Sequence, residues 1–487
     1  MKKKIRFLLS AVILFTAGII MANNINVSNV TLTGQNTPED YALVQFDLSW
    51  DNSWKDDINW DAAWVFVKYK IAGSDEWSHA VLNTTAGNHT IPSGYMCSVG
   101  LTGSSGIGTF IYRSGIGSGD NTLANVRLRW EYGVNGLADG TEVTVKVFAV
   151  EMVYVPQGAY YLGDADKDQA RCFYEYGTTG PYQVTGEEAL NIGPTNGYLW
   201  ASSYIESSLL PAAFPKGYNA IYCMKYEISE GQWLDFFNTL TDAQKAAHDI
   251  TGADLNGKNT DDVLYRNTIS WTTGDATCTR PDRACGYMSW ADHAAYSDWA
   301  GLRPMTDMEF EKACRGTQPV VDDEYAWGTA SLTAASTISG VEDGTETITN
   351  SGANCVYNQV TFTGGDGGQG PLRCGIFARS STTREQAGAS YYGIMELSGN
   401  MFERTVTVAS SPGRNFTGVQ GDGVLNADGS ANVTNWPGAD AGGVNFKGGT
   451  AASTLISDLR VSDRLYAGDG YTNRSWDIGI RSVRTAP

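Results

Sequence analysis

The second half of this chain contains long stretches of backbone that follow neither the period of a helix nor that of a strand. Residues 361–370 and 418–443 are dense in Gly, Asp, Asn and Thr, and regular structure is expected to be sparse after Gly316. Irregular backbone needs turns, water or metal ions to satisfy its N–H and C=O groups. Such a length of it is unusual in a compact domain, so this half is either disordered or held in place by something.

The composition excludes global disorder. Of the 487 residues, 42% are hydrophobic and 18% are charged, and 14 tryptophans and 25 tyrosines are present. These side chains supply ample material for packed cores. With roughly 150 residues per domain as a guide, the length predicts two to three domains.

Residues 1–22 have the pattern of a secretory signal peptide. Four basic side chains between Lys2 and Arg6 precede an apolar run over 7–21, and Ala22 is the expected last residue before cleavage. No later stretch approaches the roughly 20 apolar residues of a membrane span, and no cysteine follows the cleavage point to carry a lipid. We therefore expect an exported protein without membrane insertion, located at the cell surface, outside the cell or in the periplasm.

The charge and cysteine counts limit the partners and the chemistry. The formal net charge is −19, and removal of the four basic residues of the signal segment takes it to −23. Because nucleic-acid binding requires clustered cations, no nucleic-acid partner is expected. Eight cysteines in an oxidising compartment permit disulfides, and we expect one or two, with the pairing left open.

Residues 23–150 carry strand patterns almost throughout. Short alternating or apolar runs are separated by clusters of Gly, Asn, Asp and Ser, at 25–32, 42–50, 63–71, 109–113, 126–132 and 142–150. About seven such strands predict a β-sandwich of immunoglobulin or fibronectin type. Six tryptophans in this region favour core packing, with a sugar-binding face as the alternative. The boundary with the second domain, 151–487, is expected without a linker, which implies a fixed angle between the two.

Three helices are predicted in the second domain from their capping patterns. Ser229 with Gln232, Ser289 with Asp292, and Thr306 with Glu309 each place a hydroxyl three residues before a side chain that can bond back to the cap. Gly316 is expected to end the third helix. The histidines His79, His89, His248 and His293 occur singly and carry no ligand spacing.

Eight sequence blocks occur in an order that resembles the formylglycine-generating enzyme, or sulfatase-modifying factor, family. They lie at 152–163, 222–229, 288–304, 306–316, 325–328, 392–403, 446–450 and 479–481. The resemblance covers about 335 residues and implies an α+β domain with a C-type-lectin-like fold and little regular secondary structure. It also implies bound calcium, which would explain how the irregular half is held.

Two calcium sites are implied by this resemblance. The first falls on Asn354, the carbonyl of Cys355, Asp366 and the carbonyl of Gly368. The second falls on Glu396, the carbonyls of Gly399 and Met401, and Glu403. Calcium prefers six to eight oxygen ligands of these kinds, although the same residue types also make turns and helix caps.

The resemblance does not extend to the family's copper site. Its active members bind copper through two cysteine thiolates after the block that lies here at 446–450, and those positions fall on Ser453 and Asp458. Copper(I) needs soft ligands, and the last cysteine of the chain is Cys374. We expect no copper, no iron and no formylglycine-forming activity, with a redox enzyme of altered active site as a minor alternative.

A charged run near the same positions is a candidate ligand groove. It comprises Ser453, Asp458, Arg460, Asp463 and Arg464, the last four within one run of seven residues. Opposite charges in such a run more often form a structural ion-pair network than a binding surface.

The whole pattern predicts an exported, non-catalytic family member of the type found among Bacteroidota surface proteins. The first hypothesis is a structural or scaffold subunit that associates with itself or with other surface proteins. The second is a glycan- or peptide-binding protein that uses the lectin-like fold.

Overall fold

The computed structural model describes residues 24–166, 171–341, 343–358, 361–380 and 382–487. The segment expected to be a signal peptide, 1–22, lies outside these residues. Within them, no helix has the length and apolar character needed to cross a membrane.

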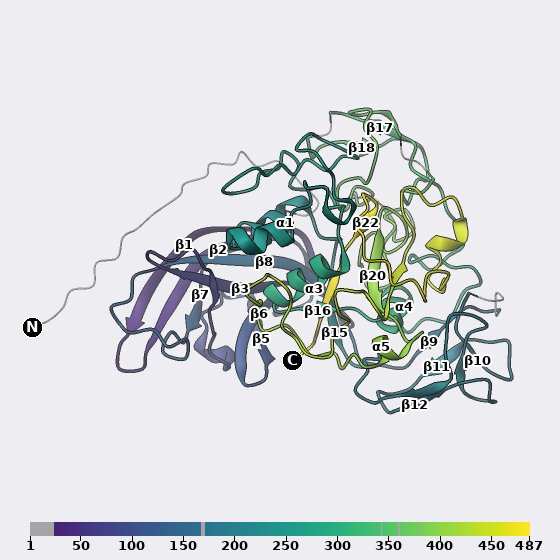
Figure 1. The fold of residues 1–487 in the computed structure, drawn as a ribbon, viewed down its shortest axis with the longest axis horizontal. Coiled ribbons are helices and arrows are strands. Elements are labelled where there is room, and N and C mark those ends of the chain that lie inside the picture. The colour runs from purple at the N-terminus through teal and green to yellow at the C-terminus, as the bar shows by residue number, and fades with distance from the viewer. Residues whose placement is uncertain (1–23, 167–170, 342, 359–360, 381) are drawn as a thin grey trace, which may run out of the picture.

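Two antiparallel sheets make up the N-terminal half (Figure 1). The smaller sheet has the order β1-β2-β7 and contains β1 (Asn26–Asn36), β2 (Tyr41–Lys55) and β7 (Gly117–Trp130). The larger contains β3 (Asp61–Ile71), β4 (Ser78–His79), β5 (Tyr95–Thr102), β6 (Ser105–Arg113) and β8 (Val143–Val155). Strands therefore occupy all six runs that the sequence predicts, and β4 and β5 lie outside these runs.

The larger sheet continues into the C-terminal half. Its order is β16-β23-β15-β8-β3-β6-β5, and β4 pairs with β3 at one side. The added strands are β15 (Ile221–Met224), β16 (Arg303–Pro304) and β23 (Ser482–Thr485). Strand β8 pairs with β3 from Val143 to Val153 and with β15 from Met152 to Val155. The expected domain boundary at 150/151 thus falls inside a strand that both halves share, which agrees with a junction that has no linker.

Both faces of β3 are buried. Alternate residues such as Val65 and Val67 pack with Phe46 and Leu128 of the smaller sheet. The opposite face, which includes Trp64, packs against helices α1 (Glu230–Phe237) and α3 (Trp290–Trp299) of the C-terminal half. The arrangement has three layers, namely the smaller sheet, the larger sheet and the helices, and this explains why β3 is apolar without alternation.

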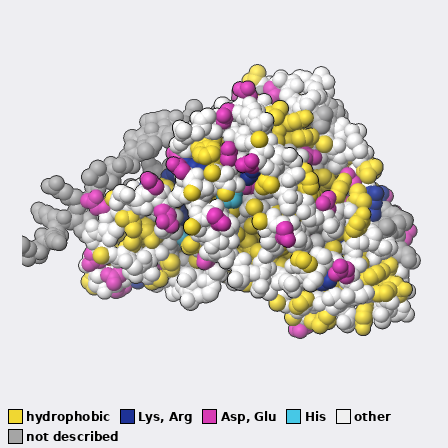
Figure 2. All heavy atoms as spheres, in the orientation of Figure 1, with side chains coloured by type: hydrophobic (Ala, Val, Ile, Leu, Met, Phe, Trp, Pro, Cys, Tyr) yellow, Lys and Arg dark blue, Asp and Glu magenta, His cyan; other side chains and the backbone are white. Residues whose placement is uncertain are grey.

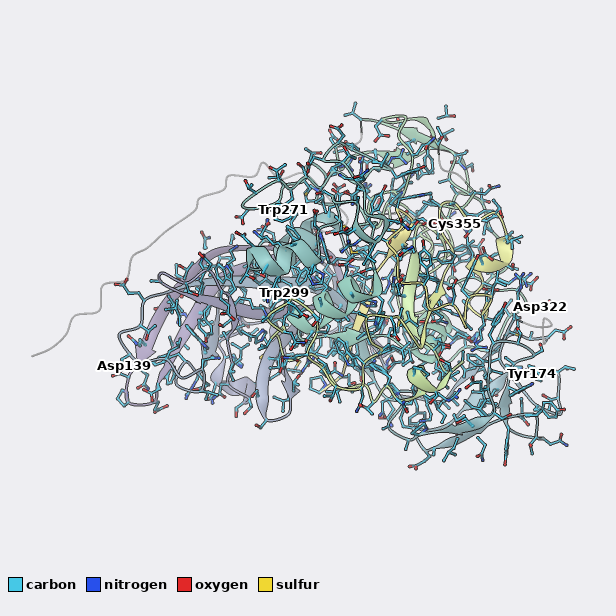
Figure 3. All side chains as sticks on the ribbon, in the orientation of Figure 1. Asp139, Tyr174, Trp271, Trp299, Asp322 and Cys355 are labelled. Atoms are coloured by element: carbon cyan, nitrogen blue, oxygen red, sulfur yellow. The ribbon has the colours of Figure 1, made fainter. Side chains whose placement is uncertain are left out.

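The three predicted helices form where their caps place them. They are α1 (Glu230–Phe237), α3 (Trp290–Trp299) and α4 (Asp307–Arg315), and each begins with a reciprocal capping box. Gly316 ends α4 with a φ of +67°, a conformation that glycine adopts without strain. Two short helices were not predicted, α2 (Asp242–Ala247) and α5 (Ser411–Arg414). Trp299, labelled in Figure 3, ends α3 and packs edge-on against Phe66 of β3.

The rest of the C-terminal half consists of small sheets and loops. Its strands are β9 (Tyr160–Leu162), β10 (Tyr174–Glu175), β11 (Tyr182–Val184), β12 (Leu190–Ile192), β13 (Leu199–Trp200), β14 (Ser208–Leu210), β17 (Thr337–Ser339), β18 (Thr347–Ile348), β19 (Thr363–Gly364), β20 (Phe402–Val406), β21 (Val444–Lys447) and β22 (Ile478–Gly479). Among the described residues after Gly316 no strand exceeds five residues, as the sequence predicts.

Protein groups hold the irregular loop 418–443 in place. Asp298, at the end of α3, accepts backbone N–H groups of Asp422 and Asn432 through its two carboxylate oxygens, at 3.1 and 2.9 Å. Its own carbonyl oxygen accepts from the N–H of Gly423 at 3.0 Å. Lys68 of β3 donates from Nζ to the carbonyl oxygen of Gly423 at 2.6 Å. Asp298 and Lys68 therefore hydrogen-bond to backbone groups of this loop. The sequence alone had suggested disorder or bound ions for it.

Core packing accounts for three of the six N-terminal tryptophans. Trp50, Trp64 and Trp130 are 0–2% exposed, whereas Trp54, Trp60 and Trp77 are partly exposed. Acidic side chains are scattered over the face seen in Figure 2, with few basic ones among them. This surface fits the acidic net charge and offers no basic patch on the visible face for nucleic acid.

Candidate functional site

Residues from both predicted calcium sites line one small cavity. It has a volume of about 10 Å³, and its walls include Asn354, Cys355, Glu396, Ser398 and Gly399. A space of this size holds one water molecule or one ion. The sequence placed Asn354 and Cys355 in one site and Glu396 and Gly399 in another, and the structure brings these four residues together.

Glu396 gives this cavity its charge. One carboxylate oxygen, Oε1, accepts from the N–H of Gly375 at 2.7 Å, while Oε2 is buried without a hydrogen-bond partner among the described residues. Burial raises the pKa of Glu396 to about 7, and the nearby Arg481 opposes this effect. An unpaired carboxylate oxygen in an enclosed space is a good ligand for a hard cation.

Glu403 and Met401, the other members of the second predicted site, do not line the cavity. Glu403 accepts from Arg481 Nε at 2.7 Å, and the N–H of Met401 donates to Glu227 at 3.1 Å. Glu227 also accepts from Asn400 Nδ2 at 2.5 Å and is fully buried. Sequence reasoning missed Glu227, although it lies in the block at 222–229.

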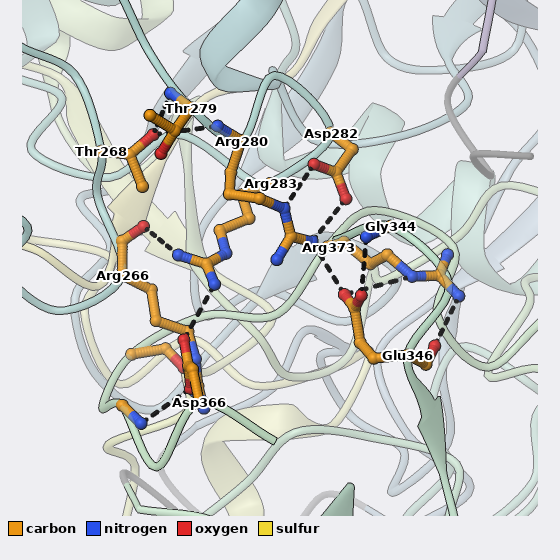
Figure 4. Close-up of polar contacts among 12 residues, drawn as sticks. Arg266, Thr268, Thr279, Arg280, Asp282, Arg283, Gly344, Glu346, Asp366 and Arg373 are labelled. Atoms are coloured by element: carbon orange, nitrogen blue, oxygen red, sulfur yellow. Dashed lines mark hydrogen bonds and ion pairs between the residues drawn. The ribbon is translucent and has the colours of Figure 1, made fainter. Parts of the chain in front are cut away.

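Asp366 of the first predicted site binds arginines (Figure 4). Its two carboxylate oxygens accept from Arg266 Nη2 at 3.0 Å and Arg283 Nη2 at 2.9 Å, and Oδ1 also accepts from the N–H of Gly368. Asn354 Oδ1 is likewise occupied, because it accepts from the N–H of Thr333 at 3.0 Å. Neither Asp366 nor Gly368 lines the cavity of Glu396. The structure therefore does not assemble this predicted site as one group.

Side chains alone do not form a metal site in the covered ranges, where no group of three or more His, Cys, Asp or Glu residues is arranged to hold an ion. A cation in the Glu396 cavity would depend on backbone carbonyl oxygens and water besides the one carboxylate. The residues present fit such a mixed site, and calcium there stays a prediction.

Ser453 and Asp458, the positions implied for the family's two thiolates, lie together. The Ser453 side chain lies near enough to the Asp458 carboxyl group to lower its pKa, which partly offsets the burial that raises it. Ser453 also accepts from the N–H of Thr450 at 3.0 Å. Asp458 lies in the 3₁₀ helix η3 (Ile456–Leu459). The two positions make a hard oxygen pair, which does not fit copper(I).

The candidate groove is more buried than its sequence suggests. Asp463 and Arg464 are 6% and 1% exposed, and the guanidinium of Arg464 stacks on Phe173 at 3.9 Å. Arg460 pairs with Asp323 at 2.7 Å, and Arg171 Nη1 lies 3.9 Å from Asp463. Burial raises the pKa of Asp463 to about 6. Most of these charges are therefore paired or buried, and exposed apolar residues also lie in the segment just before Asp458.

That segment carries exposed apolar side chains. Leu455 and Ile456, three and two residues before Asp458, are 48% and 46% exposed. Asp458 Oδ1 has no hydrogen-bond partner in the described part of the chain. Tyr357 reaches the same loop, since its hydroxyl donates to the carbonyl oxygen of Thr454 at 3.0 Å.

The expected disulfides are not present. All eight cysteines lie in the described ranges and all are free thiols, six of them buried. Burial raises the pKa of Cys355, the thiol in the cavity wall, above its usual value. The even count of cysteines was misleading because these thiols pack as small apolar side chains in separate places.

The four histidines also have structural surroundings. His248 Nδ1 contacts Asp292 at 2.8 Å, and His79 Nε2 contacts the carbonyl oxygen of Ile107 at 2.7 Å. Burial lowers the pKa of His293 to about 3.

Comparison with known families gives one match. Residues 142–486, more than two thirds of the chain, match the model of the sulfatase-modifying factor enzyme 1-like domain. The match begins at the start of β8, the strand that both halves share. No curated protein matches the chain in a sequence search.

Proposed function

Because the chain belongs to the sulfatase-modifying factor family, we propose that it is an exported, non-catalytic member that serves as a structural or scaffold subunit. It would act at the cell surface or outside the cell, as in Bacteroidota surface proteins, and calcium in the Glu396 cavity would stabilise it. Its partners would be further copies of itself or other surface proteins.

The two oxygen-bearing side chains of Ser453 and Asp458 carry the non-catalytic part of the proposal. Two thiolates at these positions would bind copper(I), whereas a hydroxyl and a carboxylate are hard ligands. No other thiol can substitute from nearby sequence, because Cys374 is the last cysteine of the chain. The family's oxidation of a substrate cysteine would therefore lack its metal.

The shared sheet supports the structural part. Strand β8 joins both halves without a linker, and the N-terminal tryptophan Trp64 donates from Nε1 to the carbonyl oxygen of Ala300 at 2.8 Å. A subunit built in this way cannot hinge easily between its halves. Such rigidity suits a component of an ordered assembly.

Negative-stain electron microscopy of the chain from Asn23 onward, with millimolar calcium and after chelation, tests this proposal. We expect ordered polymers that lose definition on chelation. Uniform monomers in both conditions would contradict a self-assembling subunit.

The second candidate function is recognition of a glycan or a peptide at the segment just before Asp458. The exposed Leu455 and Ile456, three and two residues before the buried Asp458, favour it, because a mixture of apolar and polar groups suits ligand binding. Glycan and peptide arrays, read with and without chelator, test this candidate, and saturable binding lost in the variant D458A would support it.

We predict that the double variant S453C/D458C gains stoichiometric copper(I) binding, whereas the natural chain binds none. Two adjacent thiolates restore the soft ligand pair that copper(I) requires. The measurement is copper content after anaerobic loading and desalting. The variant T454C/S457C adds two thiols to the same segment and is the control, which we expect to bind copper weakly. Tight copper binding by the unchanged chain would instead revive a redox enzyme.

A further inference from the structure

Lys225, Glu151 and Asp61 form a buried group at the joint between the two halves. Asp61 lies on β3 and Glu151 on the central strand β8, and Lys225 directly follows β15, the neighbour of β8 on its other side. The N–H of Lys225 donates to the carbonyl oxygen of Glu151 at 2.9 Å, so these two residues are aligned across the sheet.

The group also marks the place where one core gives way to another. Val147, four residues before Glu151 on β8, belongs to the core shared with the smaller sheet. Val153, two residues after Glu151, belongs to a core of the C-terminal half. A bond between Asp61 and Lys225 would therefore join the two halves across β8.

The three side chains are close and buried. Lys225 Nζ lies 3.0 Å from Glu151 Oε2 and 3.4 Å from Asp61 Oδ2. Their side chains are 5%, 1% and 0% exposed, respectively. The rings of Trp54 and Tyr226 lie 5.1 and 5.4 Å from the same nitrogen. An amine and a carboxyl group held at such a distance and shielded from solvent are placed for reaction with each other.

Three donors are directed at the Asp61 carboxyl group. Oδ1 accepts from Ser53 Oγ at 2.7 Å and from the N–H of Trp54 at 3.2 Å, and Oδ2 accepts from Trp50 Nε1 at 3.2 Å. Donors fixed in this way stabilise negative charge on an oxygen during attack at the adjacent carbon. The carboxyl group that faces the amine is therefore the one that is polarised.

Glu151 is able to carry protons between the other two. Burial raises its pKa to about 7, and its Oε1 has no hydrogen-bond partner in the described residues. Burial lowers the pKa of Lys225, but Glu151 and its other charged neighbours outweigh this effect and hold that pKa well above its usual value. The amine thus begins as an ammonium group and must pass a proton to its neighbour before it can attack.

We propose that Lys225 and Asp61 condense to an intramolecular amide bond, with Glu151 as the proton carrier. The Nζ–Cγ bond forms and the Cγ–Oδ2 bond breaks, while Oδ1 stays with its two donors as the carbonyl oxygen. Two of the three ammonium protons leave with Oδ2 as water, relayed by Glu151, which ends in the protonation state in which it began. The positive and negative charges cancel, and nothing is oxidised or reduced.

Three other buried lysines lack this arrangement. Lys68, Lys216 and Lys258 donate to backbone carbonyl oxygens, which cannot condense with an amine. Lys225 hydrogen-bonds to two carboxyl groups instead. This difference makes Lys258 a suitable control site.

Intact-mass spectrometry of the purified chain from Asn23 onward tests the proposal. We expect a mass lower than the sequence mass by one water molecule, and a branched proteolytic peptide that joins the segments around Asp61 and Lys225. The variants K225R and D61A should have their full sequence masses, while K258R should still lose water. In D61N the same bond would release ammonia in place of water, which the mass distinguishes.

The intact mass of the natural chain tests the proposal even if a variant fails to fold. A folded natural chain with its full sequence mass would overturn the proposal. Loss of water located at an Asp-Gly step such as Asp366-Gly367, where succinimides form, would overturn it too. These readouts do not depend on whether the protein is a scaffold subunit, so failure of one proposal leaves the other standing.

Discussion

Replacement of Arg481 by methionine is expected to destabilise the chain by about 3–5 kcal/mol, the usual cost of removing one partner of a buried ion pair. Arg481 is 0% exposed, and its guanidinium donates to Glu403 Oε1 and to the carbonyl oxygens of Met224 and Met395, all within 2.8 Å. Methionine fills much of the same volume but leaves a buried carboxylate and two carbonyl groups without donors. The measurement is the free energy of unfolding from denaturant titration.

Arg460 provides the matched control for this experiment. Its ion pair with Asp323 has the same length, 2.7 Å, but the two side chains are 16% and 42% exposed. R460M should therefore cost about 0–1 kcal/mol. The double variant R481M/E403Q should recover part of the loss, because the uncompensated charge is gone. Equal losses in R481M and R460M would show that burial does not set the value of the Arg481 pair.

Local sequence signals predicted the parts of the fold that depend on neighbouring residues. The hydroxyl of Ser289 and the carboxyl group of Asp292 are three positions apart, and that spacing alone predicts where α3 begins. Ser453 and Asp458 could be brought together by counting from one family block, since both lie in one short segment. In each case the interacting groups are close in the chain.

Contacts between distant segments escaped prediction. Lys225 and Asp61 are 164 residues apart. Nothing in either local sequence pattern indicates that β15 and β3 lie on the two sides of β8 in one sheet. The family resemblance implied a calcium ligand at Asp366, and the structure shows that its carboxylate also pairs with Arg266, 100 residues away. A single sequence shows which groups are able to bind a cation, but the competing arginines become visible only when the chain is folded.

Calcium and protons are expected to compete for the carboxylate of Glu396, and this competition should have a large effect on the free energy of unfolding. The folded-state pKa of Glu396 is raised to about 7 by burial, above its unfolded value near 4.5. Between these two values the folded state binds more protons than the unfolded state, so in chelator the free energy of unfolding should fall as the pH rises from about 5 to 8. Glu151 and Glu230 have pKa values raised to about 7 and act in the same direction.

At pH 8, added calcium should offset the loss of unfolding free energy that Glu396 causes. Near pH 5 calcium should have no effect, because only the ionised carboxylate binds the cation. At a calcium concentration of 100 times its Kd, the gain at pH 8 should be about 2.7 kcal/mol. E396Q should be more stable than the natural chain at pH 8 in chelator, since its neutral amide needs no proton, and should not respond to calcium. E230Q is the matched control, because Glu230 is buried with a similar pKa but bonds to Thr268 away from the cavity. A full calcium response in E396Q, measured by unfolding at both pH values, would place the cation elsewhere.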